Sequence, residues 1–282
     1  MKVLKFGGTS VGNAENIRRV KDICSKQDDD IIVVVSALGG ITDKILKAAR
    51  MAAIGTGYFQ SEITEIKNRH FELINELFEE KNPILDESIS ILLDEFEKII
   101  MGVSMIGELT PKTLDKIGGF GERLSSLIIS EYITEAKWFD SSNFIRTDSH
   151  FGKARVDFDI TNSLIKKTFG KFSGLAIIPG FIASNAAGEL TTLGRGGSDY
   201  TGAILAAALD VESLEIWTDV NGFMTADPRI ISKAYTIPTL SYAEAMELSH
   251  FGAKVIYPPT ILPVYQKGIP VRIKNTLEPE NE

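Results

Sequence analysis

Two glycine-rich segments, one at the start of the chain and one at the beginning of its last third, place cationic side chains beside backbone amides. Residues 5–10 read KFGGTS, and residues 194–199 read GRGGSD. Glycine lets backbone N–H groups approach anionic oxygens closely, and arginine can pair bidentately with a carboxylate or a phosphate. Both segments therefore indicate binding of anionic groups. Neither is a Walker A or GxGxxG motif, so a simple tight turn remains an alternative for the first and a flexible loop for the second.

Polar side chains gather again after an apolar segment in the last third of the chain. Residues 214–218 are predicted to form a strand that ends in Thr218 and Asp219, and an Asp-Pro-Arg segment follows at 227–229. Ligands of open α/β sheets bind at the carboxyl ends of strands. Lys254 lies just past a predicted helix, where a simple capping charge is the alternative to a ligand contact.

Apolar periodicity predicts the elements that would position these segments. Residues 3–6 and 31–35 are predicted strands, joined by a helix over 13–25, which suggests a βαβ unit and a parallel sheet. Residues 42–107 show helical spacing with a break near Asn82-Pro83. Residues 118–122 are predicted to be a glycine-rich turn that enters the next helix.

The second half of the chain returns to alternating strands and helices. Residues 138–145 are predicted to be extended, and residues 175–183 to be a strand interrupted at Pro179-Gly180. That strand is expected to form a hairpin with residues 190–193. The further predicted elements are a helix over 200–209, a helix over 245–251 preceded by a capping box at Ser241 and Glu244, and a strand at 271–273.

Composition limits the classes of function. The chain has 282 residues, 44% of them hydrophobic, with no apolar run of membrane-spanning length and no signal peptide at its start. The single cysteine, Cys24, excludes a disulfide framework and fits a cytoplasmic protein. The three dispersed histidines make a zinc site unlikely. A net charge of −8 argues against nucleic acid as the main partner.

Six segments together resemble the aspartate kinases of the amino-acid kinase family. In chain order they are KFGGTSVGNAENI, VVVSALGGITDKI, GFGERLS, GRGGSDYTGAILA, IWTDVNGFMTADPR and MELSHFGAKVIYPPT. The resemblance covers essentially the whole chain. MELSHFGAKV and RIKNTLEPE are most similar to the N-terminal kinase part of bifunctional aspartokinase/homoserine dehydrogenases, whose ACT and dehydrogenase domains are not expected within these residues.

The resemblance implies a fold and a division of the chain. The fold is an α/β three-layer sandwich around an open, mainly parallel sheet, with a helical insertion in the N-terminal lobe. Residues 1–282 would be a single aspartate kinase catalytic domain. Residues 1–170 would form the amino-acid-binding lobe and residues 171–282 the nucleotide-binding lobe.

The resemblance also implies the reaction. The ATP γ-phosphate would be transferred to the β-carboxylate of L-aspartate, giving 4-phospho-L-aspartate and ADP, the first step of threonine, lysine and methionine biosynthesis. Mg²⁺ would arrive with ATP, with no direct metal ligand assigned to the protein. A homodimer is expected, with no nucleic-acid or membrane partner.

Site residues follow from the same motifs. Lys5 and Asp199 are expected to be catalytic, Glu122 to bind the substrate amino group, and Arg195 to bind its α-carboxylate. The implied acceptor-binding set is Ser36, Thr42, Glu122, Arg195, Gly196, Gly197 and Ser198. The implied ATP-binding set is Lys5, Gly7, Gly8, Thr218, Asp219, Met224, Asp227, Arg229, Lys254 and Val255.

Two departures and three alternatives accompany the resemblance. Met224 stands where the family usually has tyrosine, and Tyr257-Pro258-Pro259 where it commonly reads His-Pro-Arg. One alternative is a related kinase acting on glutamate, acetylglutamate, carbamate or a nucleotide monophosphate. Another is a non-catalytic nucleotide-binding or regulatory module. The third is a fragment that folds but is impaired without its ACT domains.

Overall fold

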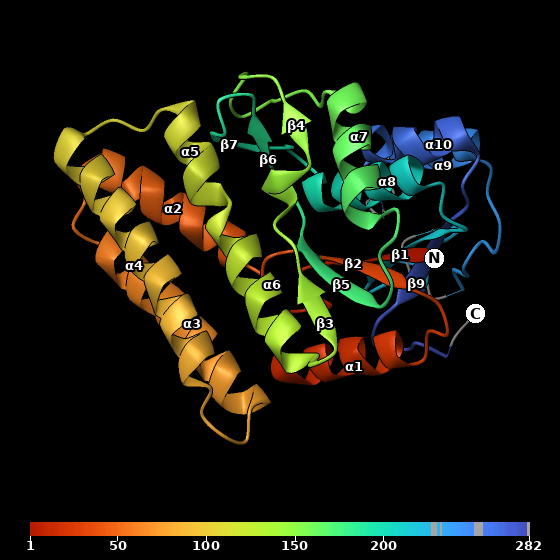
Figure 1. Ribbon diagram of the computed structural model, residues 1–282, viewed down its shortest axis with the longest axis horizontal. Coiled ribbons are helices and arrows are strands. Elements are labelled where there is room, and N and C mark those ends of the chain that lie inside the picture. Colours follow the sequence, from red (N-terminus) through yellow and green to blue (C-terminus); the bar gives the residue numbers. More distant parts are fainter. Residues whose placement is uncertain (227–229, 232, 251–255, 281–282) are drawn as a thin grey trace.

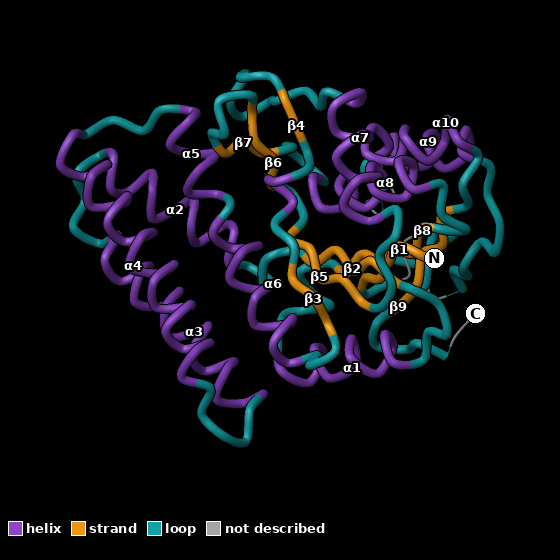
Figure 2. Tube along the Cα trace, viewed as in Figure 1, coloured by secondary structure: helices purple, strands orange, loops and turns teal. Residues whose placement is uncertain are grey.

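The centre of the molecule is a six-stranded sheet in which every pairing is parallel. The computed structural model describes residues 1–226, 230–231, 233–250 and 256–280. Figure 2 shows the strands in orange at the centre of the molecule. In spatial order the strands are β3 (Ala136–Trp138), β5 (Leu175–Pro179), β2 (Ile31–Val35), β1 (Lys2–Phe6), β8 (Leu214–Thr218) and β9 (Val271–Asn275).

A smaller, mixed sheet lies beside the large one, at the top of Figure 2. Its spatial order is β4 (Arg146–Thr147), β6 (Ile182–Asn185) and β7 (Leu190–Thr192). Strands β6 and β7 form the predicted antiparallel hairpin, whereas β4 pairs with β6 in parallel.

Helices cover both faces of the large sheet (Figure 1). On one side lie α1 (Ala14–Ser25), α2 (Ile41–Ala53), α3 (Phe59–Leu77), α4 (Pro83–Ile106), α5 (Pro111–Gly118) and α6 (Phe120–Tyr132). On the other lie α7 (Phe158–Phe169), α8 (Gly197–Leu209), α9 (Tyr242–His250) and α10 (Leu262–Lys267). Two 3₁₀ turns, η1 (Ser141–Asn143) and η2 (Pro258–Ile261), complete the assignment.

Strand alternation explains the two cores. In β2, Ile31, Val33 and Val35 belong to the core under α1 and α6, while Ile32 and Val34 belong to the core under α7 and α8. All five are buried, because helices cover both faces of this strand. The predicted three-layer α/β sandwich around a mainly parallel sheet is therefore confirmed.

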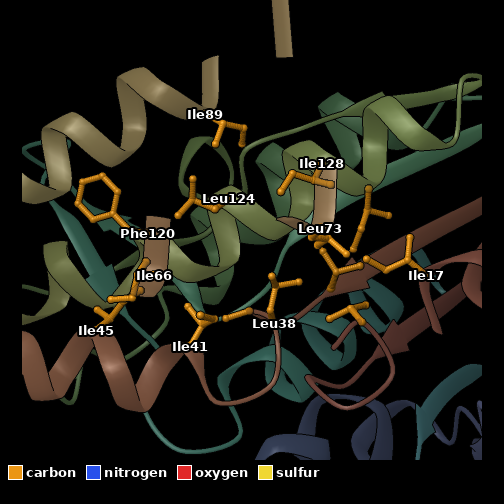
Figure 3. Close-up of a cluster of buried hydrophobic side chains, with 14 of the residues drawn as sticks. Ile17, Leu38, Ile41, Ile45, Ile66, Leu73, Ile89, Phe120, Leu124 and Ile128 are labelled. Carbon is orange, nitrogen blue, oxygen red and sulfur yellow. The ribbon is translucent and has the colours of Figure 1, made fainter. Parts of the chain in front are cut away.

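The helical region between β2 and β3 builds most of the first core. Figure 3 shows its buried aliphatic side chains converging from α2, α3, α4 and α6, with Phe120 among them. The predicted break at Asn82-Pro83 is confirmed. Asn82 caps α4 by accepting a hydrogen bond from the Leu85 N–H at 3.1 Å, and Pro83 occupies the first turn.

The prediction of a turn at residues 118–122 is wrong. Helix α6 already begins at Phe120, so Glu122 lies in its first turn. The glycines here permit close packing: a Cβ on Gly121 would lie 2.8 Å from the Ala37 Cβ, and one on Gly119 3.0 Å from the Ile182 Cγ2. Glycine was needed at these positions because neighbouring elements approach closely.

Two extended segments also differ from the prediction. Residues 138–145 contain η1, because the Asp140 carboxylate accepts a hydrogen bond from the Ser142 N–H at 2.9 Å and starts a turn. Residues 175–183 do not form one strand, since β5 and β6 belong to different sheets and the chain bends at Gly180 and Phe181 between them.

The predicted capping box is confirmed. The Ser241 N–H donates to the Glu244 carboxylate at 2.7 Å, and the Glu244 N–H donates to the Ser241 Oγ at 3.2 Å, which is a capping box at the start of α9. His70 is a fully buried packing residue. Among the described residues, no helix is long and apolar enough to cross a membrane.

Candidate active site

One cavity of about 600 Å³ opens at the carboxyl ends of β1 and β2. Parallel strands end at the same edge of a sheet, so loops that are distant in sequence meet there. The structure brings ten of the predicted site residues to this cavity. They are Lys5, Gly8, Ser36, Thr42, Glu122, Arg195, Gly196, Gly197, Ser198 and Asp199.

A buried ion pair joins the two predicted catalytic residues. The Lys5 Nζ lies 2.7 Å from the Asp199 Oδ1, and both side chains are largely buried. Lys5 follows Val3 on the face of β1 that is covered by α8, and Asp199 lies in the first turn of α8. Strand alternation and a helix start therefore direct an ammonium and a carboxylate into one cavity.

The loops that follow β1 and β2 approach each other closely. A Cβ on Gly8 would lie 3.1 Å from the Ala37 carbonyl oxygen, and one on Gly39 would lie 3.2 Å from the Gly8 carbonyl oxygen. Gly7 has a different role, because its N–H donates to the Trp217 carbonyl of β8 at 3.0 Å. Gly7 is not among the residues that line the cavity.

Glu122 is an acid of the cavity whose pKa is clearly shifted. Its side chain is buried, and one carboxylate oxygen, Oε2, has no hydrogen-bond partner among the described residues. Burial raises the pKa of Glu122 to about 7, although hydrogen bonds from backbone amides and the nearby Lys5 charge act in the opposite direction. A buried carboxylate with a free oxygen can accept a charged donor from a ligand.

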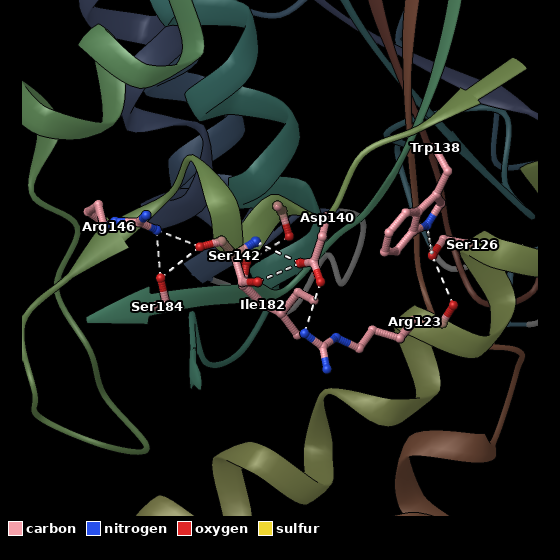
Figure 4. A network of polar contacts seen from close by, with 9 residues as sticks. Arg123, Ser126, Trp138, Asp140, Ser142, Arg146, Ile182 and Ser184 are labelled. Atoms are coloured by element: carbon pink, nitrogen blue, oxygen red, sulfur yellow. Dashed lines mark hydrogen bonds and ion pairs between the residues drawn. The ribbon is translucent and has the colours of Figure 1, made fainter. Parts of the chain in front are cut away.

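Helix α6, which carries Glu122, is fixed by polar contacts with β3 and with the segment that follows it (Figure 4). The Arg123 guanidinium forms an ion pair with Asp140 at 2.9 Å, and the Trp138 Nε1 donates to the Ser126 Oγ at 2.9 Å. The first contact ties α6 to the segment that follows β3, and the second ties it to β3 itself. Glu122 is therefore presented on a rigid element.

The opposite wall of the cavity is the loop that precedes α8. Gly196 has a left-handed backbone with φ 71°, and a Cβ there would lie 2.9 Å from the Thr260 Cγ2. The Arg195 guanidinium lies over the ring of Tyr257, 5.3 Å from its centroid. Tyr257 is one of the departures noted in the sequence, and it packs against the predicted carboxylate clamp.

Sequence reasoning missed a second buried acid in the same cavity. Asp115 of α5 accepts hydrogen bonds from the Thr192 Oγ1 at 2.7 Å, the Gly152 N–H at 2.9 Å and the Thr192 N–H at 3.2 Å. These contacts join α5 to β7 and to the loop around Gly152. Its partners are 37 and 77 residues away in the chain, so no local pattern could have revealed it.

Asp43 and Phe181 also line the cavity and were not predicted. Asp43 lies in the first turn of α2, one position after the predicted Thr42, so its proximity to Thr42 was the available signal. Phe181 lies in the bend between β5 and β6, which the sequence suggested only through the Pro179-Gly180 interruption.

Of the predicted nucleotide-binding residues, Lys5 and Gly8 line this cavity, whereas Thr218, Asp219 and Met224 do not. Thr218 ends β8, and its Oγ1 donates to the Asp219 carboxylate at 3.2 Å. Met224 forms an isolated antiparallel bridge with Thr236. Asp227, Arg229, Lys254 and Val255 lie outside the described residues.

Comparisons with known proteins agree with the topology and with the motif order. Residues 1–275 match the model of the amino acid kinase family. The lysine-sensitive aspartokinase 3 of Escherichia coli is 35% identical over 98% of this chain and 62% of its own length. The bifunctional aspartokinase/homoserine dehydrogenase of Buchnera aphidicola is 35% identical over 98% of this chain and 35% of its own length.

A solved structure gives the same result in three dimensions. Escherichia coli aspartokinase III in complex with aspartate and ADP matches with a TM-score of 0.90 and 35% identity, over 99% of this chain and 62% of that one. The chain thus spans less than two thirds of the length of these relatives. Because the family match extends over nearly all of the chain, this protein belongs to the amino acid kinase family.

Proposed function

We propose that this chain is an aspartate kinase domain that transfers the ATP γ-phosphate to the β-carboxylate of L-aspartate. The products are 4-phospho-L-aspartate and ADP, and the role is in amino-acid biosynthesis. The observation that carries the proposal is the single cavity in which Lys5, Glu122 and Arg195 meet. The likeness to aspartokinases supports the choice of aspartate among the acceptors of the family.

Charge is the main obstacle to this reaction. An aspartate β-carboxylate is already ionised near neutral pH, so it needs no general base. Phosphoryl transfer then depends on positioning and on neutralising the negative charge of both reactants. Lys5 supplies a buried ammonium at the cavity, and Asp199, paired with it at 2.7 Å, fixes its position. The Gly8 amide is the adjacent backbone donor.

The acceptor is held at its α-carbon end by groups of opposite charge. The free oxygen of Glu122 binds the amino group, and the Arg195 guanidinium binds the α-carboxylate. Ser36, Thr42, Gly196, Gly197 and Ser198 line the remaining walls. This arrangement directs the β-carboxylate toward Lys5. Arg195 to Ser198 thus reach the acceptor from the nucleotide lobe (171–282), across from Glu122 of the acceptor lobe (1–170).

The nucleotide side is assigned to the end of β8 and to two later segments of the sequence. Thr218, Asp219 and Met224 are assigned to the adenosine portion, and Asp227, Arg229, Lys254 and Val255 to ribose and phosphates. Gly7 supports the loop through its hydrogen bond to Trp217. Its N–H is therefore committed to the sheet, which leaves the phosphate contact to Gly8 and Lys5.

Mg²⁺ fits this site as a companion of ATP. Within the described ranges, no group of three His, Cys, Asp or Glu side chains could hold a metal ion by itself. Mg²⁺ commonly binds through substrate phosphates, waters and one or two carboxylates. Asp199 is the cavity carboxylate that pairs with Lys5, and Mg²⁺ bound beside it would supply charge neutralisation at the phosphates.

The wider biological setting is part of the same proposal. The chain is assigned to the cytoplasm and to the first step of threonine, lysine and methionine biosynthesis. A homodimer is proposed, and a parent protein with ACT and homoserine dehydrogenase domains is consistent with the bifunctional relatives.

The deciding experiment is aspartate-dependent ADP release with Mg²⁺, measured beside glutamate, acetylglutamate and a nucleoside monophosphate as acceptors. Of these four acceptors, we expect only aspartate to support turnover. Lys5→Ala should lower kcat by about a hundredfold or more, since one lost donor costs ~3 kcal/mol of barrier. Lys2→Ala is the matched control, because Lys2 lies on the same strand but outside the cavity. Preference for another acceptor, or near-normal turnover of Lys5→Ala, would refute the proposal.

A further inference from the structure

Phe181 lines the acceptor cavity with an unusual backbone conformation. Its φ is 68°, and the Ile182 N–H donates to the Gly180 carbonyl at 2.7 Å across it. A hydrogen bond between residues i+2 and i closes a γ-turn, and the form with positive φ at its central residue is rare and strained. A bulky side chain in this region is an outlier, since glycine adopts it freely.

Neighbouring elements hold the strained turn in place. The Phe181 N–H donates to the Thr201 Oγ1 at 3.0 Å, and the Phe181 carbonyl accepts from the Leu193 N–H at 2.8 Å. The turn is thereby tied to α8 and to the segment that leads into the Arg195 loop. Strain of this kind persists where surrounding structure maintains it, and it concentrates at functional sites. An aromatic residue in this strained conformation suggests that its ring has a functional role.

The ring lies between the two segments that carry the proposed head-group ligands. A Cβ on Gly197 would lie 2.6 Å from the Phe181 Cδ2, and one on Gly118 would lie 3.6 Å from its Cε1. Gly197 is two positions after Arg195, and Gly118 is four positions before Glu122. Both neighbours are glycines, so the ring fills the space that side chains would otherwise occupy.

We propose that Phe181 is a specificity-determining residue that limits the length of the acceptor. The inference rests on the proposed function, in which Lys5 meets the reacting carboxylate while Glu122 and Arg195 hold the α-carbon end. An acceptor one methylene longer, with its terminal carboxylate at Lys5, would press its head group against the ring. The Lys5–Asp199 pair fixes the position of the reacting carboxylate, so the extra length of the longer acceptor falls at the ring.

The test compares aspartate with glutamate, which differs by that methylene, in Phe181→Gly and Phe181→Leu. Glycine removes the ring and tolerates the positive φ, whereas leucine keeps part of the volume. One methylene in a shaped pocket is typically worth 10- to 200-fold. We expect the ratio of kcat/KM for aspartate over glutamate to fall about tenfold or more in Phe181→Gly, with Phe181→Leu intermediate.

Two controls separate a direct limit on acceptor length from a purely structural role of Phe181. Phe181→Ala removes the ring but leaves the strained φ. It should therefore change the ratio of kcat/KM as Phe181→Gly does, but it should melt at a lower temperature than Phe181→Gly. Phe139→Leu alters an aromatic cluster with Phe169 and Phe172 outside the cavity lining and should leave the ratio unchanged.

The outcomes are distinguishable. A folded Phe181→Gly with an unchanged ratio of kcat/KM overturns this inference but not the proposed function. A general defect would lower kcat/KM for aspartate and glutamate equally and would leave the ratio unchanged. Should that variant fail to fold by circular dichroism, the ratio in Phe181→Leu decides in the same way. Wild-type protein without aspartate-dependent ADP release would overturn the proposed function and this inference with it.

Discussion

Helices α5 and α6 are adjacent in the chain, and each buries one carboxylate at the same cavity. Asp115 and Glu122 are equally buried, at 4% exposure. Asp115 accepts three hydrogen bonds from the protein, whereas Glu122 has an oxygen with no partner within the described part of the chain. A buried polar group normally finds its partners within the fold, so an unpartnered oxygen on a residue that lines a cavity is available to a ligand. The comparison supports a structural role for Asp115 and the proposed ligand-binding role for Glu122.

Among the variants that test this comparison, the largest effect is expected for Glu122→Gln, which keeps the shape but removes the charge. We expect kcat/KM for aspartate to fall roughly 30- to 100-fold, about 2–3 kcal/mol, because a charge-assisted hydrogen bond is lost. The KM for ATP and the melting temperature should change little. Steady-state kinetics with each substrate varied in turn, beside thermal melting, test this. Equal changes in both KM values would contradict the assignment to the amino group.

The second prediction concerns Asp115→Ala, where the loss should appear in stability. Removing the carboxylate leaves the Gly152 N–H and the Thr192 Oγ1 without their partner, at a cost of about 2 kcal/mol. Thr192→Val, which removes one of these hydrogen bonds, should cost less. Urea unfolding of both variants measures the difference. If Asp115→Ala kept full stability but selectively weakened the binding of aspartate, the contrast between the two acids would fail.

A third prediction uses pH to separate stability from binding. The pKa of Glu122 is raised from 4.5 to about 7, so folding favours its neutral form. Its contribution to stability is therefore present below pH 4.5 and is lost as pH rises through 7. Binding of an amino group needs the ionised form, so the KM for aspartate should fall about tenfold from pH 6 to pH 8. These opposite trends distinguish a ligand-binding acid from a structural one.

Glu122→Gln is the reference for both measurements. Subtracting its unfolding free energies from those of the wild-type protein at each pH removes contributions from other titrating groups. The variant should also show a flatter dependence of the aspartate KM on pH. A wild-type KM that stays constant from pH 6 to pH 8 would show that Glu122 does not titrate in the way the burial indicates.

The smallest expected effect lies on the opposite wall, where Arg195 packs over Tyr257. A partly exposed cation–π contact is worth ~0.5–1 kcal/mol, so Tyr257→Ala should raise the KM for aspartate only about two- to fivefold. Tyr257→Phe retains the ring and should behave like the wild-type protein. A similar loss in both variants would assign the effect to the hydroxyl group.

Local features of this structure were largely predictable from the sequence. The β-branched run at 31–35 predicted a strand buried on both faces, and the Ser241–Glu244 pattern predicted a helix start. The turn expected at residues 118–122 shows the limit of such reasoning. Its glycines serve close packing against Ala37 and Ile182, and these contacts depend on elements elsewhere in the chain.

The sequence by itself determined the residue types, their order and the elements that carry them, because strand and helix periodicity are local properties. Only the tertiary structure decided which polar groups remain available. It pairs Lys5 with Asp199, commits the Gly7 amide to β8 and satisfies Asp115, and it leaves one Glu122 oxygen without a partner among the described residues. Hydrogen-bond partners and desolvation are set by segments far apart in the chain, so these differences arise only when the sheet and its helices assemble.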